Sequence, residues 1–142
     1  MTAEQMIDTF RIVIDEGFNK GNVAALDGCF NPTLTEHQFD LPSTRDEFKN
    51  TILWLRATMA DFQLTIEDIA VVGDTVWARM TARGTNVGEF MGRAPTNRSF
   101  AITVFDACRF EDGKIVEHWG VPDRFHMLIQ LGLIPGPPVP QH

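Results

Sequence analysis

The fold is decided by residues 99–123, which read SFAITVFDACRFEDGKIVEHWGVPD. Two runs rich in β-branched and aromatic residues flank Asp112-Gly113, and this dipeptide supplies the positive φ angles of a two-residue type I′ turn. We therefore predict an antiparallel hairpin with strands at Ser99–Phe110 and Lys114–Val121. The turn implies a register in which three pairs face each other across the strands: Phe110 and Ile115, Cys108 and Glu117, Asp106 and Trp119.

Because side chains alternate along a strand, this register places acids on a face that is otherwise apolar. The acids are Asp106, Glu117 and, if the alternation continues through Pro122, Asp123. A carboxylate that points into an apolar interior is costly unless it is hydrogen-bonded, neutralised or used in chemistry. His118 is predicted to point to the opposite face, as a surface or interface residue. A slip of one residue in the register would exchange the two faces.

Helix and strand signals continue outward from the hairpin. Thr2 with Gln5, and Thr44 with Glu47, form capping-box pairs that predict two helix starts. The second of these helices carries an apolar stripe made of Phe48, Ile52, Leu55 and Met59. The segment 30–42 is expected to be a loop with at most one short strand. The other predicted elements are a break at residues 17–22 that ends the first helix, a short helix at Val23–Leu26, strands at Gln63–Val72 and Thr75–Asn86, and a last helix at Arg124–Leu131.

Helices followed by a run of antiparallel strands form the α+β pattern. We expect one domain over residues 1–135, a cone-shaped curved antiparallel sheet with the N-terminal helices packed on its concave face, and a proline-rich tail at 136–142. A cavity for a small hydrophobic ligand is expected between the helices and the sheet. The outer face of the sheet would be covered in a homodimer. Its predicted residues are small or apolar: Ala101, Phe105, Ala107 and Val116.

Composition excludes several other classes of protein. The 142 residues are 44% hydrophobic with a formal net charge of −7, which argues against a nucleic-acid or anionic-membrane partner. No apolar run approaches the ~20 residues of a membrane helix, and the N-terminal residues lack the basic and apolar regions expected of a signal peptide. Two cysteines without a CxxC motif favour a reduced, cytoplasmic protein. The histidine spacing predicts no metal site, and the absence of nucleotide-binding and nucleophile-elbow motifs leaves no cofactor expected.

Four segments together resemble the SnoaL-like polyketide cyclase (ester cyclase) family. They are GTNVGEFMGRAPTNR from Gly84, DACR from Asp106, DGKIVEHWGVPD from Asp112 and QLG from Gln130. The resemblance, which covers roughly residues 30–135, implies the cone-shaped fold of nuclear transport factor 2, also called cystatin-like. It also implies intramolecular aldol cyclisation of a polyketide without metal or cofactor, with Asp123 as general acid/base. Asn86 stands where the family often has histidine.

The two candidate catalytic residues are both acids, and each has a structural alternative. Asp123 in an apolar pocket could remove a proton next to a carbonyl and then protonate the new alkoxide. It also directly precedes the last helix, where it would be a natural N-cap. Asp106 is expected in the pocket in a supporting role, or paired with an arginine.

The remaining candidates are predicted to bind substrate. They are His37, Trp54, Met59, Asn86, Phe90, Cys108, Glu117 and Trp119. Aromatic and methionine side chains would line a cavity for a flat apolar ligand, with plain core packing as the alternative. For His37 the alternative is an exposed loop position, and for Glu117 a solvated or salt-bridged one.

These residues favour an enzyme over a binding protein. The leading hypothesis is cofactor-free acid/base catalysis on a small hydrophobic carbonyl compound, with aldol cyclisation as the version that the resemblance implies. An isomerase, a dehydratase or an epoxide hydrolase would use the same carboxylates. The competing class is a non-catalytic ligand-binding or dimerisation module, in which the acids only orient a ligand. The state of the carboxylate in the pocket separates these alternatives.

Overall fold

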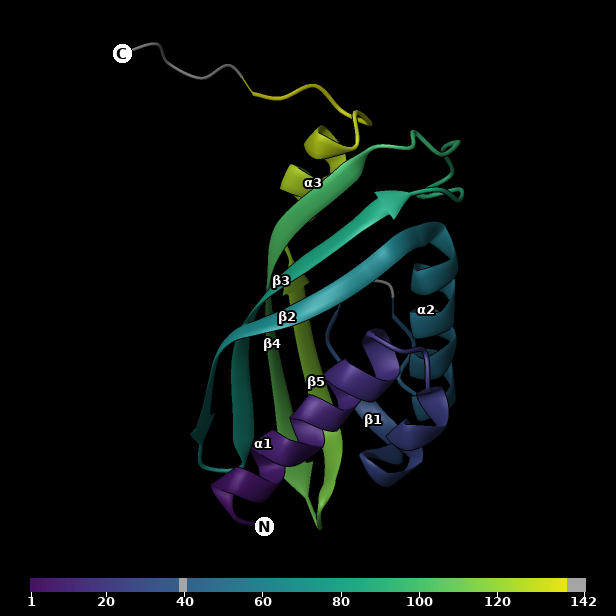
Figure 1. Ribbon diagram of the computed structural model, residues 1–142. Coiled ribbons are helices and arrows are strands. Elements are labelled where there is room, and N and C mark those ends of the chain that lie inside the picture. The colour runs from purple at the N-terminus through teal and green to yellow at the C-terminus, as the bar shows by residue number, and fades with distance from the viewer. Residues whose placement is uncertain (39–40, 138–142) are drawn as a thin grey trace, which may run out of the picture.

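In the computed structural model, which describes residues 1–38 and 41–137, five strands form one curved sheet with helices against one of its faces (Figure 1). The strand order is β1-β5-β4-β3-β2. The pairs from β2 to β5 are antiparallel, whereas β1 (Phe30–Glu36) joins β5 in parallel. The predicted α+β class and curved sheet are confirmed. Most of the predicted proline-rich tail, residues 138–142, lies outside the described residues.

The four long strands form where the period of two predicts them. They are β2 (Met59–Val72), β3 (Thr75–Asn86), β4 (Ser99–Glu111) and β5 (Lys114–Pro122). Only β2 departs clearly from its predicted bounds, because it begins four residues before Gln63. Its first residues break the alternation, since Asp61 has a φ of 54° and the pairing with β3 shifts between Ala60 and Gln63. A bulge of this kind hides the start of a strand from a period-two pattern.

The helices begin at the predicted caps. Thr2 and Gln5 form a complete capping box at α1 (Ala3–Ile12), and Thr44 accepts a hydrogen bond from the backbone of Glu47 at α2 (Arg45–Thr58). The chain beyond α1 continues as a π-helical turn, η1 (Val13–Phe18), which extends two residues into the predicted break at 17–22. The remaining helical elements are the 3₁₀ turn η2 (Val23–Gly28) and the short helix α3 (Arg124–Gln130).

The β4–β5 hairpin has the predicted turn, but its register is wrong beyond the pair of Phe110 with Ile115. Asp112 and Gly113 have φ angles of 48° and 80°, and Phe110 faces Ile115 as expected. A bulge then shifts the pairing by one residue. Because a bulge inserts one unpaired residue, every later side chain of β5 changes face. The observed pairs are Arg109 with Glu117, Cys108 with His118, Ala107 with Trp119 and Asp106 with Gly120.

The core lies between the inner face of the sheet and the N-terminal helices. In Figure 1, α1 and α2 lie on the same side of the curved sheet, and α3 stands at its end near the C-terminus. Phe10 of α1 and Ile52 of α2 are almost fully buried in one cluster with Met80 and Ile102 of the sheet. The described helices include none that is long and apolar enough to span a membrane.

Candidate active site

A cavity of about 500 Å³ lies inside this fold, a size typical of small-molecule sites. Most of its wall is apolar, with Phe48, Ile52 and Leu55 from α2 facing Met80, Ile102 and Val104 from the sheet. Its titratable lining groups among the described residues are Asp106, His118 and Arg124, and Gln38 adds an amide. The cavity is therefore an apolar pocket with a small number of polar groups in its wall.

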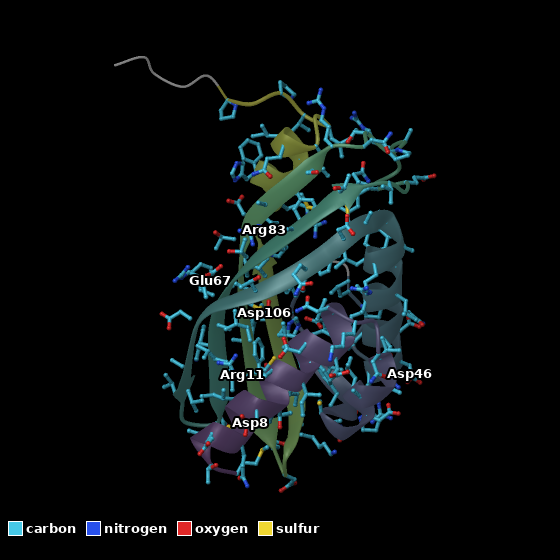
Figure 2. All side chains as sticks on the ribbon, in the orientation of Figure 1. Asp8, Arg11, Asp46, Glu67, Arg83 and Asp106 are labelled. Atoms are coloured by element: carbon cyan, nitrogen blue, oxygen red, sulfur yellow. The ribbon has the colours of Figure 1, made fainter. Side chains whose placement is uncertain are left out.

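Asp106, His118 and Glu36 form a hydrogen-bonded chain at one place in this wall. The Nε2 atom of His118 lies 3.1 Å from Asp106 Oδ2, and its Nδ1 atom lies 2.7 Å from Glu36 Oε1. The side chains are 3%, 11% and 0% exposed for His118, Asp106 and Glu36. Figure 2 shows Asp106 near the centre of the view. His118 and Asp106 line the cavity, and Glu36 lies behind them.

Strand pairing brings these three residues together from distant parts of the chain. Glu36 is paired with His118 across the parallel β1–β5 contact, and Asp106 is paired with Gly120, two positions beyond His118. Paired residues and residues two apart share a face of the sheet, so the three side chains converge on its inner face. A Cβ atom at Gly120 would come within 3.1 Å of Asp106 Oδ1 and 3.0 Å of His118 Cε1. The glycine therefore leaves room for this convergence.

Electrostatics hold His118 in its charged form. Burial by itself would lower the pKa of His118, but the charge of Asp106 and the hydrogen bonds to Asp106 and Glu36 outweigh it and raise the pKa to about 10. Both ring nitrogens then carry protons and donate to the two carboxylates.

The chemically available atom of the chain is Asp106 Oδ1. Both nitrogens of His118 are occupied by hydrogen bonds, and Glu36 Oε2 is sealed in the protein without a partner among the described residues. Oδ1 accepts no hydrogen bond from the described residues, while Oδ2 is held by His118. A carboxylate in a cavity wall, with one oxygen fixed and the other without a hydrogen bond from the described residues, can take a proton from a bound molecule and return it. The part of the chain that the structure describes contains no group of three or more acidic, histidine or cysteine side chains arranged to hold a metal ion.

Comparisons with known proteins identify the family. The sequence profile of SnoaL-like polyketide cyclases matches residues 9–131. The chain belongs to this family. It is 29% identical over 135 residues to the aklanonic acid methyl ester cyclase AcmA of Streptomyces galilaeus, covering 92% of each chain. It is 30% identical over 122 residues to the nogalonic acid methyl ester cyclase of Streptomyces nogalater, covering 81% of this chain and 89% of that enzyme.

Solved structures agree with this assignment. The crystal structure of IdmH from Streptomyces antibioticus is similar with a TM-score of 0.78 and 36% identity, covering 90% of this chain and 99% of IdmH. TsrD from Streptomyces laurentii is similar with a TM-score of 0.87 and 26% identity, covering 94% of this chain and 99% of TsrD. The protein is thus a polyketide-cyclase-like enzyme by family, and its fold is the one that the sequence resemblance implied.

Within this SnoaL-like chain, Asp123 is not placed in the cavity as the alternation predicted. It is the N-cap of α3, where its Oδ1 atom accepts a hydrogen bond from the backbone of His126, and it is exposed. The bulge in β5 removes the premise of the prediction, because it reverses the face of every later residue. The N-cap alternative is therefore the one observed, and a catalytic role for Asp123 stays an untested prediction.

The other predicted residues divide into three groups. Asp106, Trp54 and Phe90 line the cavity as expected. Met59, Asn86 and Cys108 are buried but are not among its lining residues. Asn86 has a structural position instead, since its Nδ2 atom donates to the carbonyl of Gly88 and its Oδ1 atom accepts from the backbone of Thr96, which fixes the segment after β3.

His37, Glu117 and Trp119 lie on the outer face of the sheet, which corrects their predicted place in the pocket. His37 stacks on Trp119 with 4.6 Å between ring centroids and lies 2.7 Å from Glu117 Oε2. Glu117 also accepts from Arg109 Nε at 2.7 Å, so the salt-bridged alternative for this residue is the one observed. The β5 bulge turns Glu117 and Trp119 outward, and pairing of β1 with β5 turns His37 with them.

Sequence reasoning missed four polar residues of the site, namely Glu36, Gln38, His118 and Arg124. His118 was placed on the wrong face by the bulge. Glu36 and Gln38 lie two apart in a segment expected to be mostly loop, so their shared face could be recognised only after β1 was known to pair with β5. No local signal links Glu36 to His118, because 82 positions separate them in the chain.

Proposed function

We propose that the protein closes a ring in a small, polyketide-like methyl ester by intramolecular aldol addition, with Asp106 as the general acid/base. The observation that carries this proposal is the free Oδ1 atom of Asp106 at the wall of an apolar cavity, with Oδ2 fixed by His118. The curated relatives are named as cyclases of aklanonic and nogalonic acid methyl esters, which supports the reaction and the substrate class.

The reaction moves one proton out and back. Asp106 Oδ1 takes a proton from a carbon next to a carbonyl, and the enolate carbon attacks a second carbonyl carbon to form the new C–C bond. The electron pair of that carbonyl moves onto its oxygen, and the alkoxide takes the proton from Asp106. The product is an isomer of the substrate, so no other reactant is consumed. The side-chain amide of Gln38, which lines the cavity and has no partner among the described side chains, is a donor for the developing alkoxide.

His118 and Glu36 are positioning residues in this proposal. His118 fixes the orientation of the Asp106 carboxyl group through Nε2, and Glu36 fixes the imidazolium through Nδ1. Fixing a catalytic group by a second, buried layer of hydrogen bonds is how such sites obtain precise geometry.

The experiment is turnover of a substrate of the relatives. The purified protein is incubated with nogalonic acid methyl ester or aklanonic acid methyl ester. The products are separated by chromatography, and their molecular masses are measured by mass spectrometry. The proposal predicts a product of unchanged mass with a new absorption spectrum and retention time. Tight binding of these esters without any conversion would instead favour a ligand-binding role for the same cavity.

We also propose that two copies of the chain pair through the outer face of the sheet, in a reduced cytoplasmic compartment. Phe105 and Val121 are paired across β4 and β5 and are 54% and 67% exposed, and Trp77 is exposed on the same face. An apolar patch of this kind on a sheet is typical of an interface. Both cysteines are free and buried, which supports a reducing location. Light scattering on the purified protein gives the mass of the assembly and tests the pairing.

A further inference from the structure

Arg124 is the permanently charged cation of the cavity wall, and its charge has no use in the proposed proton transfer. Its guanidinium lies 5.5 Å from the ring centroid of Phe90, which is buried and lines the cavity. Phe90 in turn stacks on Trp54 with 5.8 Å between ring centroids. The cation therefore sits at the end of an aromatic wall that suits a flat ligand.

No carboxylate of the described residues neutralises Arg124. Its chain neighbour Asp123 is turned back to the backbone of His126, and the ion pairs of the described residues do not include Arg124. Arg124 is exposed as a residue, and contact of its guanidinium with the apolar wall lowers its pKa. A cation in an apolar wall without an internal partner is suited to receive an anion from a ligand.

Asp106 and Arg124 place an acid and a permanent cation in the wall of the same cavity. Asp106 is paired with Gly120, and Arg124 follows four residues later along the chain, past Pro122 in the wall. Four residues span at most roughly 13 Å at about 3.3 Å per residue. This upper bound is within the length of a few fused rings, so one flat ligand in the cavity can reach both residues.

We infer that Arg124 binds an anionic oxygen of the ligand, so that the site prefers aromatic carbonyl compounds with a carboxylate, phenolate or enolate at the end away from Asp106. The inference rests on the proposed function, since it requires the cavity to hold the substrate. The protein carries a formal net charge of −7, which disfavours anions in general. A preference for an anion therefore has to come from a local group.

The test compares ligands that share one ring system and differ in charge. Anthraquinone-2-carboxylate and its methyl ester are titrated into the protein by calorimetry, together with 2-hydroxyanthraquinone below and above the ionisation of its phenol. We expect the wild type to bind the carboxylate about tenfold or more tightly than the ester, as expected for a charge-assisted contact. Tighter binding of the phenolate than of the phenol would assign the site to ring hydroxyls as well as carboxylates.

Two arginine variants separate a local contact from overall charge. Arg124→Gln should abolish the preference for the carboxylate, because affinity for the carboxylate falls much more than affinity for the ester. Arg83→Gln removes the same charge from an exposed position of β3, at the edge of the molecule in Figure 2, and should change neither affinity. Arg124→Lys should keep part of the preference, because the charge remains without the planar fork.

Each result decides the matter. If Arg124→Gln weakens binding of the carboxylate and the ester equally, the role of Arg124 is overturned. The same holds if Arg83→Gln reduces the preference for the carboxylate as much as Arg124→Gln does. In both cases the proposed cavity and its chemistry remain supported. Equal affinity of the wild type for the acid and the ester would also overturn the role of Arg124 without affecting the proposed chemistry. Failure of both ligands to bind the wild type would overturn the inference together with the proposed use of the cavity.

Discussion

The Oε1 atom of Glu36 lies 2.7 Å from the Nδ1 atom of His118, although 82 positions separate them in the chain. The contact depends on the parallel pairing of β1 with β5, the one parallel contact in the described sheet. His118, held in place by Glu36, in turn fixes the orientation of the Asp106 carboxyl group through its Nε2 atom. The first strand therefore determines the geometry of a residue in the fourth.

Replacing Glu36 should change the titration of His118. In Glu36→Gln one of the two carboxylates that raise the pKa of His118 to about 10 is lost, so the pKa should fall. Histidine side-chain NMR signals followed against pH measure this directly. Glu117→Gln is the matched control, because Glu117 contacts His37 on the outer face and should leave the titration of His118 unchanged. An unaltered pKa in Glu36→Gln would show that Glu36 does not hold the imidazolium.

The same shift predicts how stability depends on pH. The pKa of His118 is raised from 6.5 to about 10 on folding, so its stabilising contribution is complete below pH 6.5 and is lost as pH rises through about 10. His118→Asn leaves two buried carboxylates without a cation and should cost about 3–5 kcal/mol of unfolding free energy near neutral pH. Denaturant unfolding from pH 6 to pH 10 should show this difference shrinking. A constant difference over that range would contradict the assignment of the shift to His118.

Local signals in the sequence predicted most of the fold. The caps at Thr2 and Thr44 and the turn at Asp112-Gly113 depend on residues within a few positions, and all three are confirmed. The inner face of β4, which includes Asp106, follows from simple alternation and is also confirmed. These features need no knowledge of distant contacts.

The candidate site could be predicted only in part, because it depends on one bulge and one long-range pairing. No residue at or near Val116 indicates a bulge in the sequence. The bulge nevertheless places His118, and not Glu117, on the inner face. The contribution of Glu36 depends on a parallel contact across 82 positions, which alternation within a strand cannot reveal. Asp106 was found because its own strand is regular.

Gly120→Ala should impair the site more than the fold. The new Cβ atom would collide with Gln38 Oε1 and come close to Asp106 Oδ1 and His118 Cε1. The end of a flexible glutamine can move aside, so the unfolding free energy should fall by only about 1 kcal/mol. Turnover should drop more strongly, because the carboxylate and the amide donor are displaced together. Chemical unfolding and turnover of the same preparation compare the two effects, and full activity in this variant would argue against a site at Gly120.

A charge on the outer face should separate the proposed dimer. Phe105→Asp places a carboxylate in the apolar patch, and a buried unpaired charge is strongly unfavourable at an interface. Light scattering should give twice the 16.0 kDa chain mass for the wild type and a single chain for the variant. Leu53→Asp, at an exposed apolar position of α2, is the control and should leave the assembly unchanged. A wild-type monomer would refute the pairing.

The most direct test of the account compares Asp106→Asn with Asp123→Asn in steady-state turnover of a methyl ester substrate. Both changes remove one charge, and asparagine keeps the N-cap of α3 and the shape of the Asp106 side chain. If Asp106 Oδ1 is the general acid/base, Asp106→Asn should lower kcat by about 10²–10⁴-fold while Asp123→Asn remains active. Loss of turnover in Asp123→Asn with activity retained in Asp106→Asn would contradict the account and assign the proton transfer to the residue that caps α3.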